Sequence, residues 1–326
     1  MPAHIISASR RTDIPAFFTP WLMQRIRAGF VMVRNPRNPE HVMRVSLAAD
    51  DVIAIVFWSR DYGRLLPYLD EIDARELRPC FQFTLTGYGA PLELRGPSEE
   101  QGIDQFRKLS ARYGSRRVIW RYDPIVMGSR HDATWHLSRF EELARRLAGV
   151  SSDAVISFLD MYASARRGLA AVAEATGERF DAPTLEERIE LAGKMVAIGV
   201  EHGMRVRICC EPDVAASAVI EPARCIDPEL IQEIAGAAVL NLRAAPARKG
   251  CGCVFARDIG AYHCCAHGCV YCYANDSPEA GLDNARKVDA SANHLGAGDI
   301  AEQKPPSRKG AQQLRLALDD RQRGRR

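Results

Sequence analysis

The sequence lacks any long apolar run, and this absence limits where the protein can act. No stretch of ~18 consecutive apolar residues occurs, although 47% of the 326 residues are hydrophobic, so we predict no membrane-spanning helix. Arg10, Arg11 and Asp13 interrupt the N-terminal segment before an apolar stretch develops, which is unlike a signal peptide. No internal repeat is visible. We therefore expect a cytoplasmic protein with no membrane partner.

The chain also lacks a strong net charge. A formal net charge of +3 is too small to predict nucleic-acid binding for the molecule as a whole. Residues 304–326 hold eight Lys or Arg and two Asp, a net of +6, which leaves about −3 for the remaining residues. We expect residues 277–326 to form a weakly ordered basic tail, which is either simply solvated or contacts nucleic acid.

Cysteine, in contrast, is abundant. The chain has ten cysteines, and because a reducing compartment disfavours structural disulfides, clustered cysteines predict metal or cluster ligands. Six of them fall within 22 residues: Cys251, Cys253, Cys264, Cys265, Cys269 and Cys272.

Short apolar runs alternate with helical patterns along most of the chain, which predicts an α/β fold with a mostly parallel sheet. Helix starts are marked by Thr19 before Pro20, by Ser98, by Asp132 and by the pair Thr184 and Glu187, which has capping-box spacing. A further helix is expected to begin at 227–228 and to end at 236. The expected strands are 4–8, 52–58, 80–86, 118–122, 154–159, 205–210 and, more weakly, 239–242, with a side hairpin of 31–34 and 42–47.

Polar residues follow most of these strands, and this favours a TIM-like barrel, either complete or in an incomplete or permuted form. Barrel enzymes build their active sites from the carboxyl ends of several strands. Arg121, Asp123, Asp160 and Glu211 occupy such positions, so we predict that they are catalytic or bind polar groups of a substrate. An ion-pair network that closes the barrel face would explain them equally, and a doubly wound open sheet is the alternative fold.

Cys265, Cys269 and Cys272 have the spacing C-x3-C-x2-C, which suits three corners of a [4Fe–4S] cluster. Such clusters otherwise take four thiolates, so a set of three implies either a distant fourth ligand or an iron open to a small molecule. Tyr271 and Tyr273 lie in the same loop and would pack on the cluster or on a cofactor ring, or simply cover the metal site. Four further cysteines would hold a second Fe–S cluster or a zinc ion if they are not merely buried apolar residues: Cys209, Cys225, Cys251 and Cys253.

The spacing with an aromatic residue before the last cysteine resembles the signature of the radical S-adenosylmethionine superfamily. The run HGCVYCYAN at 267–275 is similar to the cluster loop of spore photoproduct lyase-type members. The resemblance implies that S-adenosylmethionine binds the open iron and is cleaved to a 5′-deoxyadenosyl radical, with an electron donor such as flavodoxin or ferredoxin. Arg10 and Arg11 suit a carboxylate or phosphate of the cofactor, since guanidinium groups bind such groups through two hydrogen bonds.

The whole chain also resembles the DUF1848 family of uncharacterised bacterial and archaeal proteins, which brings a suspected cluster and no known reaction. The matching pieces are IISASRRTDIP at 5–15, VRNP at 33–36, FQFTLTGY at 81–88, IWRYDP at 119–124, ISFLD at 156–160, CID at 225–227 and the cysteine loop.

Three functions follow as hypotheses. The first is a radical S-adenosylmethionine enzyme. The second is a binding protein stabilised by zinc or an Fe–S cluster, whose basic tail contacts nucleic acid. The third is a barrel hydrolase or lyase with a structural cluster. In each, we expect a barrel-like domain over 1–248, a cysteine-rich loop over 249–276 and the basic tail over 277–326.

Overall fold

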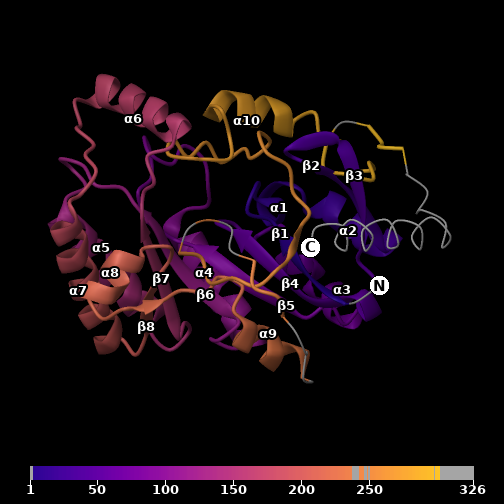
Figure 1. Cartoon of the computed structure of the whole chain (residues 1–326), viewed down its shortest axis with the longest axis horizontal. Helices are drawn as coiled ribbons and strands as arrows, with labels where there is room; N and C mark the ends of the chain where they lie inside the picture. The colour runs from indigo at the N-terminus through magenta and orange to yellow at the C-terminus, as the bar shows by residue number, and fades with distance from the viewer. Residues whose placement is uncertain (1–2, 237–241, 246–247, 249, 297, 302–326) are drawn as a thin grey trace, which may run out of the picture.

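The computed structural model describes residues 3–236, 242–245, 248, 250–296 and 298–301. Its centre is an eight-stranded sheet in which every neighbouring pair of strands is parallel (Figure 1). The strand order is β10-β1-β4-β5-β6-β7-β8-β9. The strands are β1 (His4–Ala8), β4 (Val52–Ser59), β5 (Pro79–Thr84), β6 (Val118–Ile125), β7 (Asp153–Phe158), β8 (Arg205–Ile208), β9 (Glu221–Pro222) and β10 (Arg257–Asp258).

The α/β class, the mostly parallel sheet and the six main strands expected from the sequence are confirmed, but a complete TIM-like barrel is not formed. From β1 to β9 the order in the sheet follows the order in the chain, as it would in a barrel. The two edge strands, β9 and β10, have two residues each and are not paired with one another within the described part of the chain, so the sheet is open. Such short edges supply few hydrogen bonds with which to close a ring. The weaker strand candidate at 239–242 lies almost entirely outside the described residues.

The expected side hairpin is confirmed as an antiparallel pair of β2 (Phe30–Asn35) and β3 (Asn38–Ser46). Two short 3-10 helices cover Ala49–Asp51 and Leu66–Tyr68. The α-helices are α1 (Ile14–Phe17), α2 (Thr19–Ala28), α3 (Leu69–Ala74), α4 (Glu99–Tyr113), α5 (Ala133–Leu147), α6 (Ala163–Thr176), α7 (Leu185–Glu201), α8 (Pro212–Ser217), α9 (Pro228–Ala235) and α10 (Pro278–Ala285).

Most of the predicted helix starts are confirmed. Ser98 and Thr184 each form a complete capping box, and the Asp132 side chain caps α5. The start of α2 is shifted by one residue, since Thr19 is its first helical residue and Phe18 occupies the cap position. These caps satisfy backbone N–H groups that a helix leaves without partners.

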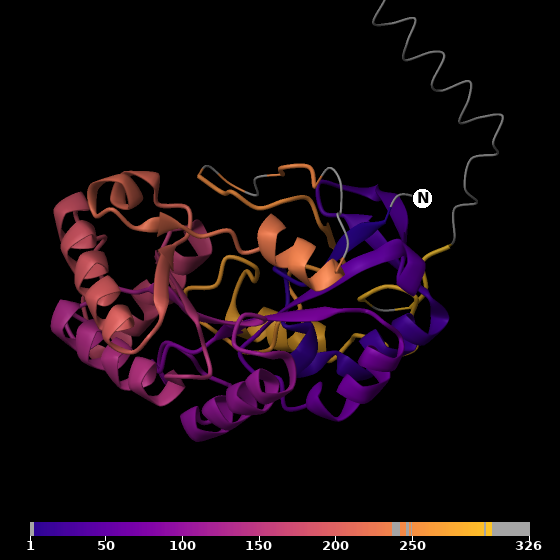
Figure 2. The same ribbon diagram turned by 90° about the horizontal axis from the view of Figure 1, so that it is seen from below.

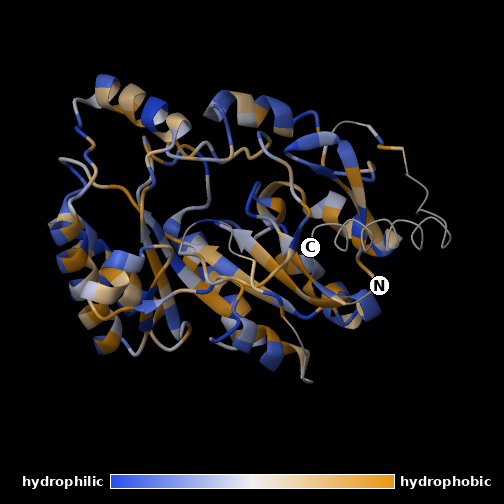
Figure 3. Cartoon of the chain, viewed as in Figure 1, coloured by the Kyte–Doolittle hydropathy of each residue, from blue (hydrophilic) through white to orange (hydrophobic). Residues whose placement is uncertain are grey.

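Side chains of the strands alternate between two apolar layers, and the strands are largely hydrophobic in Figure 3. The larger layer lies under the helices and includes Phe57, Phe83 and Trp120. The second layer lies on the opposite face, which we call the inner face, where Val56 and Ile119 pack with α9. Figure 2 shows α9, in orange, across the sheet from the purple and magenta helices. One end of the inner face is therefore closed by apolar packing.

Residues 278–296 and 298–301, where no regular element was expected, pack against the domain. Helix α10 begins at a Ser277 cap, and the Trp21 indole N–H donates to the carbonyl oxygens of Ala292 and His294 at 3.0 Å. The remainder of the basic tail, 302–326, lies outside the described residues. No helix in the described ranges is both long and apolar enough to cross a bilayer.

A buried histidine beside β6 makes stability depend on pH. His136 is fully buried, and its Nε2 lies 3.1 Å from the Val126 carbonyl oxygen. Because that oxygen can only accept, Nε2 carries the proton and Nδ1 accepts from the Tyr122 hydroxyl at 2.8 Å. Burial lowers the pKa of His136 from 6.5 to about 4.

We therefore expect acidification to weaken the fold through this one group. The unfolded chain binds a proton near pH 6.5 while the folded chain resists it until about pH 4, so stability present above pH 6.5 is lost as the pH falls between these values. The full loss is about 3 kcal/mol. Urea unfolding of the wild type and of His136→Gln between pH 7 and pH 4 measures it. The variant should show the shallower decline, and parallel curves would contradict the prediction.

Candidate functional site

The inner face changes from apolar to polar toward the carboxyl ends of the strands. Side chains on one face of a strand recur every second residue. Residues near the carboxyl ends of the strands therefore share the inner face with the apolar residues that precede them. This row combines an indole, an amide, a guanidinium, a hydroxyl and a thiol. Its members are Trp58, Gln82, Arg121, Ser157 and Cys209.

The three cysteines with the C-x3-C-x2-C spacing lie in the segment 260–275, which we call the cysteine loop. This loop lies over the carboxyl ends of the strands. Its backbone pairs with the loop that follows β5, through Arg95 N to His267 O and Val270 N to Leu92 O, both 3.0 Å. The Ser164 hydroxyl of α6 donates to the Cys272 carbonyl oxygen at 2.8 Å. The loop is thus held by backbone hydrogen bonds on one side and by a side-chain hydrogen bond on the other.

Asp13 anchors the loop to the first strands. One carboxylate oxygen accepts from the Ser59 hydroxyl at 2.7 Å, and the other accepts from the Arg60 backbone N–H at 3.0 Å and faces His267 Nε2 at 2.7 Å. His267 Nδ1 lies 3.1 Å from the Arg95 carbonyl oxygen. Asp13 and His267 are both buried, so this pairing fixes the loop relative to β1 and β4.

A buried ion pair lies directly beside the cysteines. Arg60 and Glu93 contact each other, and the Arg60 guanidinium also donates to Cys269 Sγ at 3.2 Å and to the Tyr271 hydroxyl at 3.3 Å. The Thr86 hydroxyl donates to Glu93 at 2.7 Å, and the Tyr271 hydroxyl donates to the same carboxylate. Burial by itself would raise the pKa of Glu93, but the Arg60 charge outweighs it and holds that pKa below its usual value. The pair is therefore ionised.

The three cysteines of the loop are partly buried free thiols. Burial raises the pKa of Cys265, Cys269 and Cys272, that of Cys269 to about 11. These side chains are therefore neutral in the protein alone, and a bound metal would supply the positive charge that thiolates need. In the described ranges, no three His, Cys, Asp or Glu side chains are already arranged as ligands of one metal ion.

A second group of sulfur atoms lies on the inner face, beyond the loop. Cys209 Sγ contacts Cys210 Sγ and Cys225 Sγ, both at 3.6 Å. Cys225 also interacts with Cys253, and Cys210 with Cys251. Hydrogen bonds from the neighbouring Cys209 and Cys253 thiols, with Arg121 nearby, hold the pKa of Cys225 well below its usual value. The sequence predicted four of these residues and missed Cys210.

Arg121 links this second sulfur group to the strand ends. Its guanidinium donates to Cys225 Sγ at 2.9 Å and to the Gln82 amide oxygen at 3.2 Å, and it contacts the Asp123 carboxylate. It also lies over the Trp58 ring at 5.4 Å. The Trp58 indole N–H is buried and has no hydrogen-bond partner among the described residues. A buried donor of this kind is suited to a bound ligand.

Asp160 and Glu211 do not join the pair of Arg121 and Asp123. Asp160 is exposed and forms an ion pair with Arg248. Glu211 pairs with Arg188 at 2.8 Å, and burial raises the pKa of Glu211.

Three of the predicted cofactor-binding residues lie around the loop's outer side. The Tyr273 hydroxyl contacts the Arg10 carbonyl oxygen at 2.5 Å, and the Arg10 guanidinium lies 5.7 Å from the centre of the Trp58 ring. Arg11 forms an ion pair with Asp258 at 3.8 Å. Arg11 also lines a hollow of about 240 Å³ together with Arg34, Tyr262, His263 and His294. This hollow adjoins the cysteine loop and is rich in cationic and aromatic groups.

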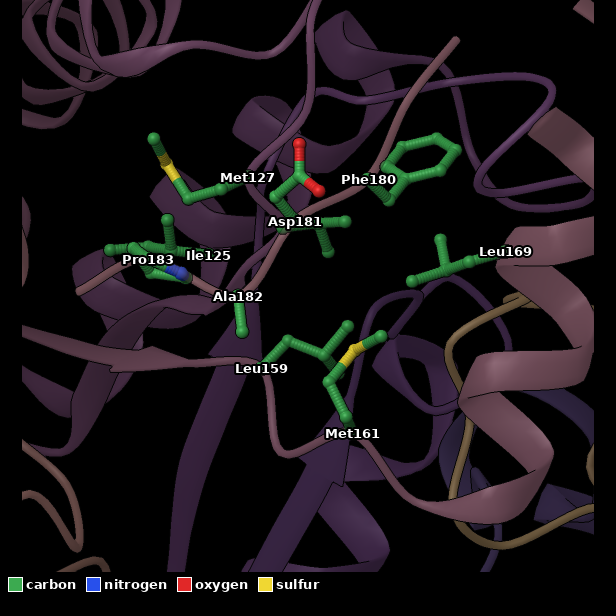
Figure 4. A pocket seen from close by; sticks show the side chains of 10 residues that line it. Ile125, Met127, Leu159, Met161, Leu169, Phe180, Asp181, Ala182 and Pro183 are labelled. Carbon is green, nitrogen blue, oxygen red and sulfur yellow. The ribbon is translucent and has the colours of Figure 1, made fainter.

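A second hollow is small and apolar. Figure 4 shows Leu159, Met161 and Leu169 around it, with Phe180 and Asp181 on a neighbouring segment. It has room for about one water molecule, about 10 Å³. It is a packing gap beside α6 and has no cysteine among its lining residues.

Glu93 and His267 are central to the site, and their contacts could not be predicted, since both bind partners far away in the sequence. Glu93 follows no strand, and its partner Tyr271 is 178 residues away. The available signal was a single acidic residue between two leucines, Leu92 and Leu94. The importance of Arg60 was signalled better, since it directly follows β4.

A family model described as "Domain of unknown function (DUF1848)" matches residues 5–274. The match covers the whole eight-stranded sheet except His4, together with most of the cysteine loop. No curated protein matches the chain.

Proposed function

The chain belongs to the DUF1848 family, and we propose that its Cys265, Cys269 and Cys272 loop binds a [4Fe–4S] cluster for a radical S-adenosylmethionine-type reaction. The observation that carries the proposal is the placement of three free, partly buried thiols on one anchored loop. This loop lies over the carboxyl ends of parallel strands, where α/β enzymes bind their ligands.

We propose a cluster rather than a single ion for this donor set. A cubane binds each thiolate through a different iron atom, so its ligands lie farther apart than those of one ion. Arg60, which donates to Cys269 Sγ at 3.2 Å, would offset part of the negative charge of the bound thiolates. Hydrogen bonds to ligand sulfurs also set the potential of such a cluster.

The two histidines of the loop are engaged elsewhere, which supports an open fourth corner. His267 faces Asp13 at 2.7 Å, and His263 faces Asp276 at 3.3 Å. Cys264 donates to the Ala261 carbonyl oxygen at 3.2 Å and packs in the apolar layer under the helices. A cluster with an open iron supplies reductive cleavage of S-adenosylmethionine when both are bound.

The residues of this chain would then bind and orient the cofactor. Arg11 and Arg34 in the adjoining hollow suit its carboxylate. The buried Trp58 N–H offers a donor on the inner face. Arg121 and Asp123 would orient polar groups of the substrate. The apolar layer behind them, closed by α9, would exclude water from that end of the face.

The experiment is anaerobic purification of the full chain, followed by iron and sulfide analysis, reduction and addition of S-adenosylmethionine. We expect equal numbers of iron and sulfide, and release of 5′-deoxyadenosine. Single Ala replacements of Cys265, Cys269 or Cys272 should remove both, whereas Cys264→Ala, the matched control in the same loop, should retain them. Iron and sulfide at background in the wild type, or a cluster that survives all three replacements, would refute the proposal.

A further inference from the structure

Five cysteines outside the loop meet where the sheet is open. Cys209 and Cys210 follow β8, Cys225 follows β9, and Cys251 and Cys253 precede β10. Since β9 and β10 are the two edges of the sheet, the sulfur group joins chain segments from both edges. The Ile226 backbone N–H points at Cys253 Sγ at 3.4 Å, and Val254 N donates to the Ile226 carbonyl oxygen at 3.2 Å.

Two of the distances between sulfur atoms match those between ligands around one ion. A zinc ion holds thiolates at about 2.3 Å in a tetrahedron, which puts sulfur atoms about 3.8 Å apart. Cys209 Sγ lies 3.6 Å from the Sγ atoms of both Cys210 and Cys225. A second cubane would need wider spacing, because its thiolates bind separate iron atoms.

The backbone at Cys210 adopts a strained conformation, and this conformation allows the Cys209 and Cys210 sulfur atoms to meet. The φ of Cys210 is +61°, a left-handed value that non-glycine residues seldom adopt. Successive side chains of an extended strand point to opposite faces, so a regular continuation of β8 would separate the two sulfurs. The left-handed turn instead brings Cys210 Sγ to the side of Cys209 Sγ. Strain of this kind is kept where surrounding interactions repay it.

We infer that Cys209, Cys210, Cys225 and Cys253 bind one structural zinc ion, separate from the cysteine loop. Without a metal ion, these four thiols contact one another in a chain. No three potential ligand side chains among the described residues surround one common point. Rotation of a cysteine side chain between staggered positions moves its sulfur by about 3 Å, and such rotation would accompany zinc binding. Cys251 contacts Cys210 from outside the set.

The charge around the group suits a thiolate-bound ion. Four thiolates around Zn²⁺ carry a net charge of −2, and such a charge needs a buried cation nearby. Arg121 supplies one, since its guanidinium lies 2.9 Å from Cys225 Sγ. The Gln82 amide also donates to the Cys225 carbonyl oxygen at 2.9 Å, which fixes the segment after β9. The ion would tie both edges of the open sheet together.

The test counts metal and sulfide in the full chain purified without oxygen from zinc-supplemented cells. A cluster contributes iron and sulfide in equal numbers, whereas this site contributes zinc without sulfide, so the two proposals fail independently. We expect one zinc ion per chain. Cys225→Ser and Cys253→Ser should each lose it while iron and sulfide stay unchanged. Cys80→Ser is the matched control, because Cys80 is buried on the same face, and it should retain the zinc.

A second measurement covers the case in which the variants do not fold. Cobalt(II) added to the zinc-depleted wild type should give thiolate-to-cobalt charge-transfer bands and the visible spectrum of a tetrahedral site. The inference is overturned if the wild type holds no zinc above background and shows no such spectrum, if Cys225→Ser retains its zinc, or if that variant loses iron and sulfide together instead.

Discussion

Replacing Glu93 with Gln is expected to destabilise the protein by about 3 kcal/mol, because it leaves the Arg60 charge buried without a counter-charge. Gln has nearly the same shape as Glu, so the Thr86 and Tyr271 hydroxyls would keep an oxygen to donate to. The change therefore isolates the charge. The Glu93 side chain is only 5% exposed and that of Arg60 17%, so water cannot replace the missing carboxylate.

The matched control is Glu71→Gln, which removes the same charge from a surface pair. Glu71 accepts from Arg27 and Arg75, and these side chains are substantially exposed. Screening by solvent makes such pairs contribute little, so we expect the urea midpoint to stay close to that of the wild type. Equal losses in the two variants would contradict the assignment of Arg60 and Glu93 as a buried ion pair.

A double variant separates charge from packing. Arg60→Met with Glu93→Gln removes both charges, so it should recover part of the stability lost by Glu93→Gln alone. Bound thiolates beside Arg60 would also offset its charge. We therefore expect the loss caused by Glu93→Gln to be larger in metal-free protein than in protein loaded anaerobically with iron and sulfide. An identical loss of stability in the two forms would mean that Arg60 does not interact with metal-bound thiolates.

Local signals predicted the elements of the fold well, since each depends on residues close together in the chain. Ser98 and Thr184 satisfy the first N–H groups of their own helices, and alternation of apolar residues defines the strands, so both can be read from a short window. Closure of the sheet depends instead on whether β9 and β10 meet, and each has only two residues. No apolar pattern of that length distinguishes an open sheet from a closed one.

In the candidate site, too, the local features could be predicted from the sequence and the long-range contacts could not. The positions of Cys265, Cys269 and Cys272 on one loop could be predicted from their spacing. The first and last of them are only seven positions apart in the chain, so their side chains cannot lie far from one another. The partners of that loop could not be predicted, since Asp13 and His267 are 254 residues apart in sequence. The contact between Cys209 and Cys225 also depends on how β8 and the segment after β9 lie together, which the sequence left open.

These observations lead to one physical account of the inner face. Its amino-terminal end is closed by Val56, Ile119 and α9, while its carboxyl end carries sulfur, guanidinium and amide groups. The two sulfur groups lie on different supports: one on an anchored loop and the other on the edges of the sheet. Damage to the loop support should therefore affect the proposed cluster before the proposed zinc ion, and this expectation can be tested by adding a single methyl group.

Gly168→Ala is expected to displace the cysteine loop and to remove most of the bound iron. Gly168 lies in α6, and a Cβ atom there would be 2.0 Å from the Val270 carbonyl oxygen and 2.8 Å from its carbonyl carbon. Both atoms belong to the backbone, so no side-chain rotation relieves the clash. Either α6 or the segment between Cys269 and Cys272 must move, at a cost of about 1–3 kcal/mol.

The control is Gly193→Ala in α7, where a Cβ atom would have no neighbour within 4 Å. Because Ala favours a helix interior over Gly, this variant should gain about 0.5–1 kcal/mol and bind iron like the wild type. Metal analysis and urea unfolding of both variants measure the two effects. If Gly168→Ala loses iron and keeps zinc, the loop and the sheet edges are separate metal supports. If it keeps its iron, the close packing of α6 on Val270 does not hold the cluster loop in place.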